Sequence, residues 1–276
     1  KAQSESGMTD RPLTTDLHPV AMTVAGSDSG GGAGIQADLR AFSFFNVFGT
    51  TVITAVTAQN PTTVADVHPL PQAAVQAQYH AIRDAFTVKA AKTGMLFSSA
   101  LIETVAGLAL ECPATPWVMD PVMVATSGAR LLQADAIEAL RSGLLPLASV
   151  ITPNLPEAEI LCGHSLESPE EIERAAGQLC ERYNCAVLLK GGHRTVNPGV
   201  DIACDAEGLW RLESPMVAAA SDHGTGCALS AAIAACLARG DSVLDAMVRA
   251  KAFVYGSLRN CLRVGPDTWA MASPAE

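Results

Sequence analysis

Several features that define large classes of proteins are absent from this sequence of 276 residues. No apolar run reaches the roughly 18 residues that a membrane-spanning helix requires, so we expect no association with a membrane. Basic residues are in the minority, with 18 Lys and Arg against 28 Asp and Glu, which argues against a nucleic-acid-binding surface. With a net charge of −10, any phosphate-bearing ligand needs local positive charge from a lysine, a helix terminus or a metal ion.

Metal-binding and disulfide patterns are absent too. The eight cysteines are scattered and include no Cys-x-x-Cys pair, and no closely spaced pair of histidines accompanies them. This argues against a structural zinc site. The N-terminus lacks the charged-then-apolar order of a secretory signal, so we expect a cytoplasmic protein with reduced thiols.

What the sequence has is a strong core pattern, with 49% apolar and 17% charged residues. Short apolar runs alternate with helix-like segments from Val20 onward, without an internal repeat or a linker. This order predicts an α/β fold with a central, mostly parallel sheet between two helical layers. We expect strands over Val20–Ala25, Thr50–Ala58, Ala90–Thr93, Trp117–Met119, Val150–Thr152 and Ala186–Lys190, a hairpin over Asp201–Glu213, and helices over Gly34–Phe45, Gln72–Ala85, Ser98–Leu110, Gln133–Leu144, Pro156–Cys162, Pro169–Tyr183, Gly226–Arg239 and Ser242–Leu262.

The first residues differ from the rest in being polar and without pattern. We expect residues 1–18 to form a tail that is disordered or derived from a cloning vector, with Met8 as the native start. Residues 19–276 are expected to form a single domain.

The segment Ser221–Ile233 is the most informative part of the chain. A Gly-Thr-Gly turn, Gly224–Gly226, stands directly before an alanine-rich helix that Cys227 begins. Helix N-termini attract anions through free N–H groups and the helix dipole, and the glycines permit close approach. The same field is expected to lower the pKa of Cys227, which would make it a possible base. A tight loop-to-helix junction with a small buried cysteine is the structural alternative.

Other polar segments follow predicted strands, and the carboxyl ends of parallel strands are where open sheets bind ligands. The glycine-rich turn Gly26–Gly34 is neither a phosphate loop nor a dinucleotide fingerprint, and it either admits a flat ligand or serves only as a turn. The Gln59 amide both donates and accepts hydrogen bonds, which suits an aminopyrimidine edge, although it could instead satisfy loop backbone groups.

Charged and amide side chains end three further strands. Asp120, Asn154 and Glu157 offer hard oxygen ligands that suit Mg²⁺ held together with nucleotide phosphates. A capping role for Asn154 is an equal alternative. Lys190 stands beside two glycines, where its ammonium could reach a transferring phosphate or simply be solvated.

Taken together, these motifs resemble the hydroxymethylpyrimidine/phosphomethylpyrimidine kinases of thiamine biosynthesis, in the ribokinase-like superfamily. The resemblance extends from about Val20 to Val264. Its motifs are Val24–Leu39, Ala55–Asn60, Lys92–Leu96, Asp120–Gly128, Ile151–Glu159, Lys190–His193 and His223–Ser230. It implies a ribokinase-like three-layer α/β/α domain, a homodimer, and ATP-dependent phosphorylation of 4-amino-5-hydroxymethyl-2-methylpyrimidine and then of its monophosphate.

The resemblance also implies roles for individual residues. Cys227 and Lys190 would be catalytic, and the backbone of Gly224, Thr225 and Gly226 would form an anion hole. Lys190, Asn154 and Thr225 would bind ATP, and Asp120 and Glu157 would organise Mg²⁺. The substrate pocket would comprise Gln59, Gly26, Asp28, Met95 and Val122.

Three positions depart from the pattern of the family. Thr126 stands where relatives commonly have lysine, Asp222 precedes His223 in place of Asn or Thr, and Ala228 replaces a common threonine. One cationic contact to phosphate would therefore be missing. The alternatives are a pyridoxal/pyridoxine kinase of the same superfamily, which Gln59 and Met95 disfavour, and a non-catalytic pyrimidine-binding protein.

Overall fold

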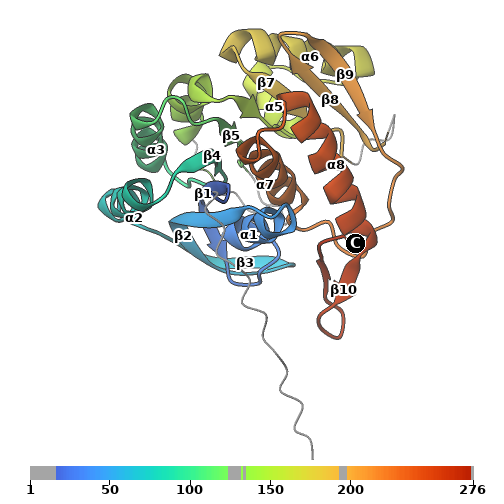
Figure 1. Cartoon of the computed structure of the whole chain (residues 1–276). Coiled ribbons are helices and arrows are strands. Elements are labelled where there is room, and N and C mark those ends of the chain that lie inside the picture. The colour runs from blue at the N-terminus through green and yellow to red at the C-terminus, as the bar shows by residue number, and fades with distance from the viewer. Residues whose placement is uncertain (1–16, 124–131, 133–134, 193–197, 275–276) are drawn as a thin grey trace, which may run out of the picture.

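A computed structural model describes residues 17–123, 132, 135–192 and 198–274. Its centre is a nine-stranded sheet in the order β3-β2-β1-β4-β5-β6-β7-β8-β9 (Figure 1). The strands from β2 to β7 in this order pair in parallel, whereas β3, β8 and β9 extend the two edges in antiparallel fashion. The bounds are β1 Val20–Asp28, β2 Phe48–Asn60, β3 Thr63–Pro69, β4 Val88–Thr93, β5 Trp117–Met119, β6 Val150–Ile151, β7 Ala186–Leu189, β8 Val200–Asp205 and β9 Gly208–Glu213.

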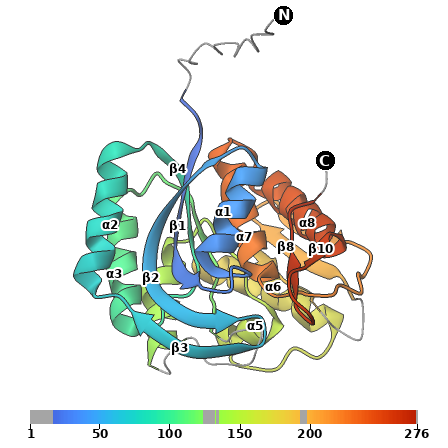
Figure 2. The same cartoon turned by 90° about the horizontal axis from the view of Figure 1, so that it is seen from below.

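Helices cover both faces of this sheet, as Figure 2 shows from below. Successive strand residues point to opposite faces, so Trp117 and Met119 join one apolar cluster while Val118 joins the other. The predicted three-layer α/β/α architecture is therefore confirmed. One face packs against α2 Gln72–Ala85, α3 Ser99–Glu111, α4 Ala136–Ala139, α5 Leu155–Cys162 and α6 Pro169–Tyr183, and the other against α1 Gly34–Phe44, α7 Thr225–Ala238 and α8 Val243–Arg259.

Local sequence signals determine where several helices begin. Asn154 and Glu157 form a reciprocal capping box at the start of α5, and Ser168 and Glu171 do the same for α6. The Ser242 side chain caps α8 by accepting a hydrogen bond from the backbone N–H of Asp245. The first of these caps fixes the loop that follows β6.

Some predicted elements were wrong in extent or missing. The helix predicted over Ser242–Leu262 ends at Arg259, and a hairpin of β10 Cys261–Arg263 and β11 Trp269–Met271 follows it. The strand β3 was not predicted, because this edge strand is largely exposed and has no buried alternation.

The helix predicted over Gln133–Leu144 is described only from Ala136, and it continues as a π-helical turn, Leu140–Leu144. The predictions on residues 1–16 and on Thr126 lie outside the described residues. Within those residues, no helix combines the length and apolar character that crossing a membrane requires.

Candidate active site at the carboxyl edge of the sheet

A cavity of about 720 Å³ lies at the carboxyl edge of the parallel strands, between the first turns of α5 and α7. The expectation that the strand-end motifs meet at one edge is confirmed. Ala33 after β1, Gln59 at the end of β2 and residues that follow β5, β6 and β7 line this cavity together. We refer to it as the acceptor cavity. Ten of the predicted site residues line it: Gln59, Asp120, Val122, Asn154, Glu157, Lys190, Gly224, Thr225, Gly226 and Cys227.

A second cavity of about 510 Å³ adjoins the first on the side of α8, and we refer to it as the outer cavity. Apolar side chains such as Leu229, Val254 and Leu258 form much of its lining. The two cavities therefore meet at the start of α7, and the residues common to both linings, here called the shared wall, are Lys190, Gly192, Asp222, Thr225 and Gly226.

Lys190 is an ion-paired residue of this shared wall. Its Nζ lies 2.9 Å from Oδ1 of Asp120 and 4.0 Å from Oε2 of Glu157. Burial lowers the pKa of Lys190, but the two carboxylates outweigh burial and raise it above its usual value. The ammonium is therefore charged at neutral pH and held at the meeting point of the cavities.

Asn154 and Glu157 have a structural role in addition to any role in binding. The Asn154 Oδ1 accepts the backbone N–H of Glu157 at 2.9 Å, and the Glu157 Oε2 accepts the backbone N–H of Asn154 at 2.8 Å. The capping alternative for Asn154 is thus confirmed. Burial raises the pKa of Glu157 to about 7, despite the lowering effect of Lys190.

The start of α7 has the geometry of an anion site. Gly224 has a φ of 86°, which favours glycine, and a Cβ there would collide with the carbonyl oxygen of Gly32. Among the described residues no side chain caps this helix. The backbone N–H of Thr225 already donates to the Asp222 carbonyl at 3.2 Å, so the N–H groups of Gly226 and Cys227 are the better anion donors.

Cys227 lies near the buried ion pair of Lys92 and Asp38. The ammonium of Lys92 and the carboxylate of Asp38 both act on its thiol, the lysine lowering and the aspartate raising its pKa. Burial is the largest effect and raises the pKa of Cys227 to about 11. The expectation that the helix N-terminus lowers the pKa of this thiol was wrong, because burial outweighs the favourable charges.

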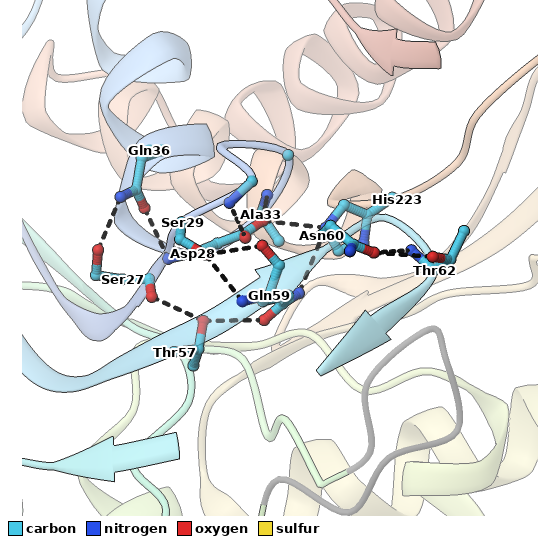
Figure 3. Close-up of polar contacts among 12 residues, drawn as sticks. Ser27, Asp28, Ser29, Ala33, Gln36, Thr57, Gln59, Asn60, Thr62 and His223 are labelled. Carbon is cyan, nitrogen blue, oxygen red and sulfur yellow. Dashed lines mark hydrogen bonds and ion pairs between the residues drawn. The ribbon is translucent and has the colours of Figure 1, made fainter. Parts of the chain in front are cut away.

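The carboxylate of Asp28 holds the glycine-rich turn after β1 in its conformation. The Asp28 carboxylate accepts the backbone N–H groups of Gly30 and Ala33 at 2.8 Å each. Its Oδ2 also lies 3.1 Å from Nε2 of His223, which lines the acceptor cavity (Figure 3). The side chain of Asp28 is 2% exposed.

Two other predicted pocket residues lie behind the lining of the acceptor cavity. A Cβ on Gly26 would come within 2.6 Å of the Met95 Cε, so Met95 packs directly over this glycine. Met95 and Ala55 form a small buried cluster against which Val122 packs. Of the described pocket residues predicted from the sequence, Gly26, Asp28 and Met95 are the three outside the lining.

His223 and Lys92 were not singled out from the sequence as individual residues. Asp38, together with Asp28, indicates a site in the glycine-rich segment. The structure brings Lys92 and Asp38 close to Cys227. It places His223 in the lining of the acceptor cavity. Lys92 is the last residue but one of β4, directly after two alanines, and it is fully buried. A charged residue at the end of a short buried strand was the signal available. His223 directly precedes the Gly-Thr-Gly turn, and only the fold reveals that Asp28 meets it from 195 residues away.

Comparisons with known proteins agree with this geometry. Residues 28–272 match the family described as phosphomethylpyrimidine kinase. The chain belongs to the phosphomethylpyrimidine kinase family. It is 45% identical to the hydroxymethylpyrimidine/phosphomethylpyrimidine kinase of Haemophilus influenzae over 249 residues. The aligned region covers 88% of this chain and 92% of that protein.

Solved structures confirm the ribokinase-like fold of this kinase family member. An ADP complex of Bacillus subtilis pyridoxal kinase superposes with a TM-score of 0.85 at 37% identity, over 93% of this chain and 97% of that one. A phosphomethylpyrimidine kinase from Clostridium difficile superposes with a TM-score of 0.77 at 36% identity, over 85% of this chain and 97% of that one. As a member of the family, the chain is a phosphotransferase, and kinases of this family use ATP.

Proposed function

We propose that this protein phosphorylates 4-amino-5-hydroxymethyl-2-methylpyrimidine with ATP and then phosphorylates the resulting monophosphate, in thiamine biosynthesis. The observation that supports this most is the pair of cavities that meet at Lys190 and the start of α7. A phosphoryl donor in the outer cavity and an alcohol in the acceptor cavity would face each other across the shared wall. The family names of the relatives point to the same reaction.

The reaction transfers one phosphoryl group. The hydroxyl oxygen bonds to the γ-phosphorus of ATP, the bond from that phosphorus to the β–γ bridging oxygen breaks, and ADP and the hydroxyl proton leave. Catalysis of such a step depends on positioning and on stabilising negative charge. Lys190 and the N–H groups of Gly226 and Cys227 are proposed to stabilise the charge, and Asn154 and Thr225 to border the nucleotide phosphates.

Cys227 is proposed to contact the acceptor hydroxyl at the start of α7. Because burial raises its pKa to about 11, most of this thiol holds its proton at neutral pH. Its thiolate fraction, which Lys92 favours, would set how readily it accepts the hydroxyl proton.

The residues present fit Mg²⁺ bound together with ATP. Within the described residues no group of three or more His, Cys, Asp or Glu side chains could hold a metal, so a site made only of protein ligands is not expected there. Mg²⁺ usually binds through one or two carboxylates plus substrate phosphates. Asp120 and Glu157 are carboxylates of the acceptor cavity that face Lys190 of the shared wall. When bound, the ion would neutralise phosphate charge; Asp120 and Glu157 are the residues proposed to hold it.

Steady-state kinetics with three acceptors tests this proposal. ADP release is measured with the pyrimidine alcohol, its monophosphate and pyridoxal in parallel on one preparation. We expect the first two to be turned over with higher kcat/KM than pyridoxal. A higher value for pyridoxal would favour the pyridoxal kinase alternative, which the Bacillus structure also suggests, and binding of the pyrimidine without ADP release would favour a binding protein.

The finer expectations on the cell and the assembly are part of the proposal. We propose that residues 19–276 act as one kinase domain, in the cytoplasm and as a homodimer. Light scattering of the purified chain measures the mass in solution, and a monomeric mass under assay conditions would overturn the dimer.

A further inference from the structure

Both the backbone and the side-chain amide of Gln59 have hydrogen-bonding partners within the protein (Figure 3). The Ser29 Oγ accepts its backbone N–H at 2.8 Å and donates to its carbonyl oxygen at 2.8 Å. One end of its side-chain amide, Oε1, lies 3.2 Å from Thr57 Oγ1, and the other, Nε2, lies 3.5 Å from His223 Nε2. Such a preorganised amide on the lining of the acceptor cavity is suited to recognition.

The protons around this amide are limited in number. The Thr57 hydroxyl has one proton, and the Ser27 carbonyl oxygen, 2.9 Å away, accepts it. His223 Nε2 has at most one proton, and it faces Asp28 Oδ2 at 3.1 Å. Burial raises the pKa of Asp28, but hydrogen bonds from His223, Ala33 and Gly30 outweigh burial and hold it below its usual value, so this carboxylate is ionised. The Asp28 carboxylate therefore accepts a hydrogen bond from the N–H of His223 Nε2.

Thr57 and His223 differ in whether they can accept a hydrogen bond from the amide of Gln59. Thr57 Oγ1 donates its only proton to the Ser27 carbonyl oxygen and can therefore only accept a hydrogen bond from the amide. His223 Nε2 carries the proton that it donates to Asp28 and has no lone pair left with which to accept an amide N–H. The two ends of a carboxamide have the same shape, and a half-turn about the last side-chain bond exchanges them. The proton count therefore favours the amide nitrogen on the side of Thr57 and the amide oxygen on the side of His223.

We propose that His223 and Thr57 fix the direction of the Gln59 amide, with its oxygen toward His223, and that His223 is thereby a specificity-determining positioning residue. The amide keeps one further N–H and one further lone pair for a ligand, in a fixed order. A 4-aminopyrimidine has an amino donor beside a ring-nitrogen acceptor and matches that order in one orientation only. The orientation of the ring then decides on which side its hydroxymethyl group lies.

This inference rests on the proposed pyrimidine substrate, and it predicts discrimination against pyridoxal. The pyridoxal ring has a hydroxyl and an aldehyde in place of an amino group next to a ring nitrogen, so it gains less from a directed amide. Without His223 the amide loses its preferred direction. The activity toward the pyrimidine alcohol is then expected to fall more than the activity toward pyridoxal.

The experiment measures the ratio of kcat/KM for the pyrimidine alcohol to kcat/KM for pyridoxal on one preparation, so that the folded fraction cancels. His223→Phe is expected to lower this ratio about tenfold, the equivalent of one directed hydrogen bond. His223→Gln keeps a side-chain N–H and is expected to retain most of the ratio. The matched control is His68→Phe on β3, where the side chain is 74% exposed, and it is expected to change nothing.

A double variant separates positioning through Gln59 from a general effect on the fold. In a Gln59→Leu background, His223→Phe is expected to cause no further fall in the ratio, because the amide it directs is gone. An additional fall of the same size there would overturn the proposal, as would an unchanged ratio in His223→Phe. If His223→Phe does not fold, Thr57→Val should lower the ratio and Thr57→Ser should keep it, and equal ratios would again overturn it.

The activity of the wild-type protein shows whether a negative result contradicts the positioning role of His223 or the proposed kinase function. A wild type that turns over the pyrimidine alcohol while His223→Phe leaves the ratio unchanged contradicts the positioning role alone. A wild type that does not turn over the pyrimidine alcohol contradicts the proposed function itself.

Discussion

The ammonium of Lys92 lies 2.9 Å from both carboxylate oxygens of Asp38, and neither side chain is exposed to solvent. Thr23 completes the arrangement by donating its hydroxyl to Asp38 Oδ2 at 2.6 Å. The pair joins β4 to α1, and both of its charges act on the thiol of Cys227. A buried ion pair costs desolvation energy, and its geometry here supplies several hydrogen bonds in return.

Removing one partner of this pair should be more harmful than removing both. Lys92→Met leaves the Asp38 carboxylate buried without its cation and is expected to cost about 3–5 kcal/mol in the free energy of unfolding. The double variant Lys92→Met/Asp38→Leu should recover most of that loss. Urea unfolding of both variants measures it, and a single variant as stable as the wild type would contradict the role of the pair.

Cys227→Ala is expected to lower kcat far more than it raises the KM for the pyrimidine, because the proposed role lies in transfer. The raised pKa of about 11 also predicts a pH dependence: the thiolate fraction grows as pH rises toward that value, so kcat should increase between pH 7 and pH 9. The alanine variant should lack this increase. Equal losses in kcat and affinity, or the same pH profile in both proteins, would indicate a packing role instead.

Glu157→Gln tests the raised pKa of a buried carboxyl group. The pKa of Glu157 is about 7 in the folded chain against an ordinary value of 4.5, so between these values the folded state binds more protons than the unfolded state. Stability from this group is therefore lost as pH rises from about 4.5 to about 7.

Glutamine is neutral and can keep the capping box, so the variant should gain stability relative to the wild type as pH rises, on the order of 1–3 kcal/mol in total. Free energies of unfolding at pH 5 and pH 8 measure this change. Parallel pH profiles for the two proteins would contradict the raised pKa.

Gly224→Ala should be destabilising for two reasons, a strained backbone and a collision with the Gly32 carbonyl oxygen. Gly240 provides the matched control, because its φ of 92° is similarly positive but nothing lies within 4 Å of a Cβ there. Gly240→Ala should cost about 1 kcal/mol, the penalty of the left-handed conformation alone, and Gly224→Ala should cost clearly more and also weaken ATP binding. Equal melting temperatures would show that the turn tolerates a side chain.

Most of the site could be predicted because strand periodicity determines where polar residues leave the sheet. Asp120, Asn154 and Lys190 each follow a short apolar strand, and parallel pairing then brings them to one edge. The structure also places Lys190 in an ion pair, which excludes the simple solvated lysine.

What could not be predicted depends on contacts between distant parts of the chain. The pKa of Cys227 is set by burial, which the helix pattern alone does not reveal. The contact of Asp28 with His223 joins the end of β1 to the turn before α7, and no sequence pattern reveals a contact across 195 residues. The strand β3 has no buried face that a pattern could reveal, and only its pairing with β2 defines it.

The close approach of Gly224 to Gly32 has a consequence for how this enzyme could change. The turn before α7 and the loop that supports Gln59 touch through bare backbone at Gly224 and Gly32, without room for a side chain between them. Neither loop can shift without displacing the other. A new acceptor specificity would therefore arise more readily at Val122, whose side chain lines the acceptor cavity and belongs to neither loop.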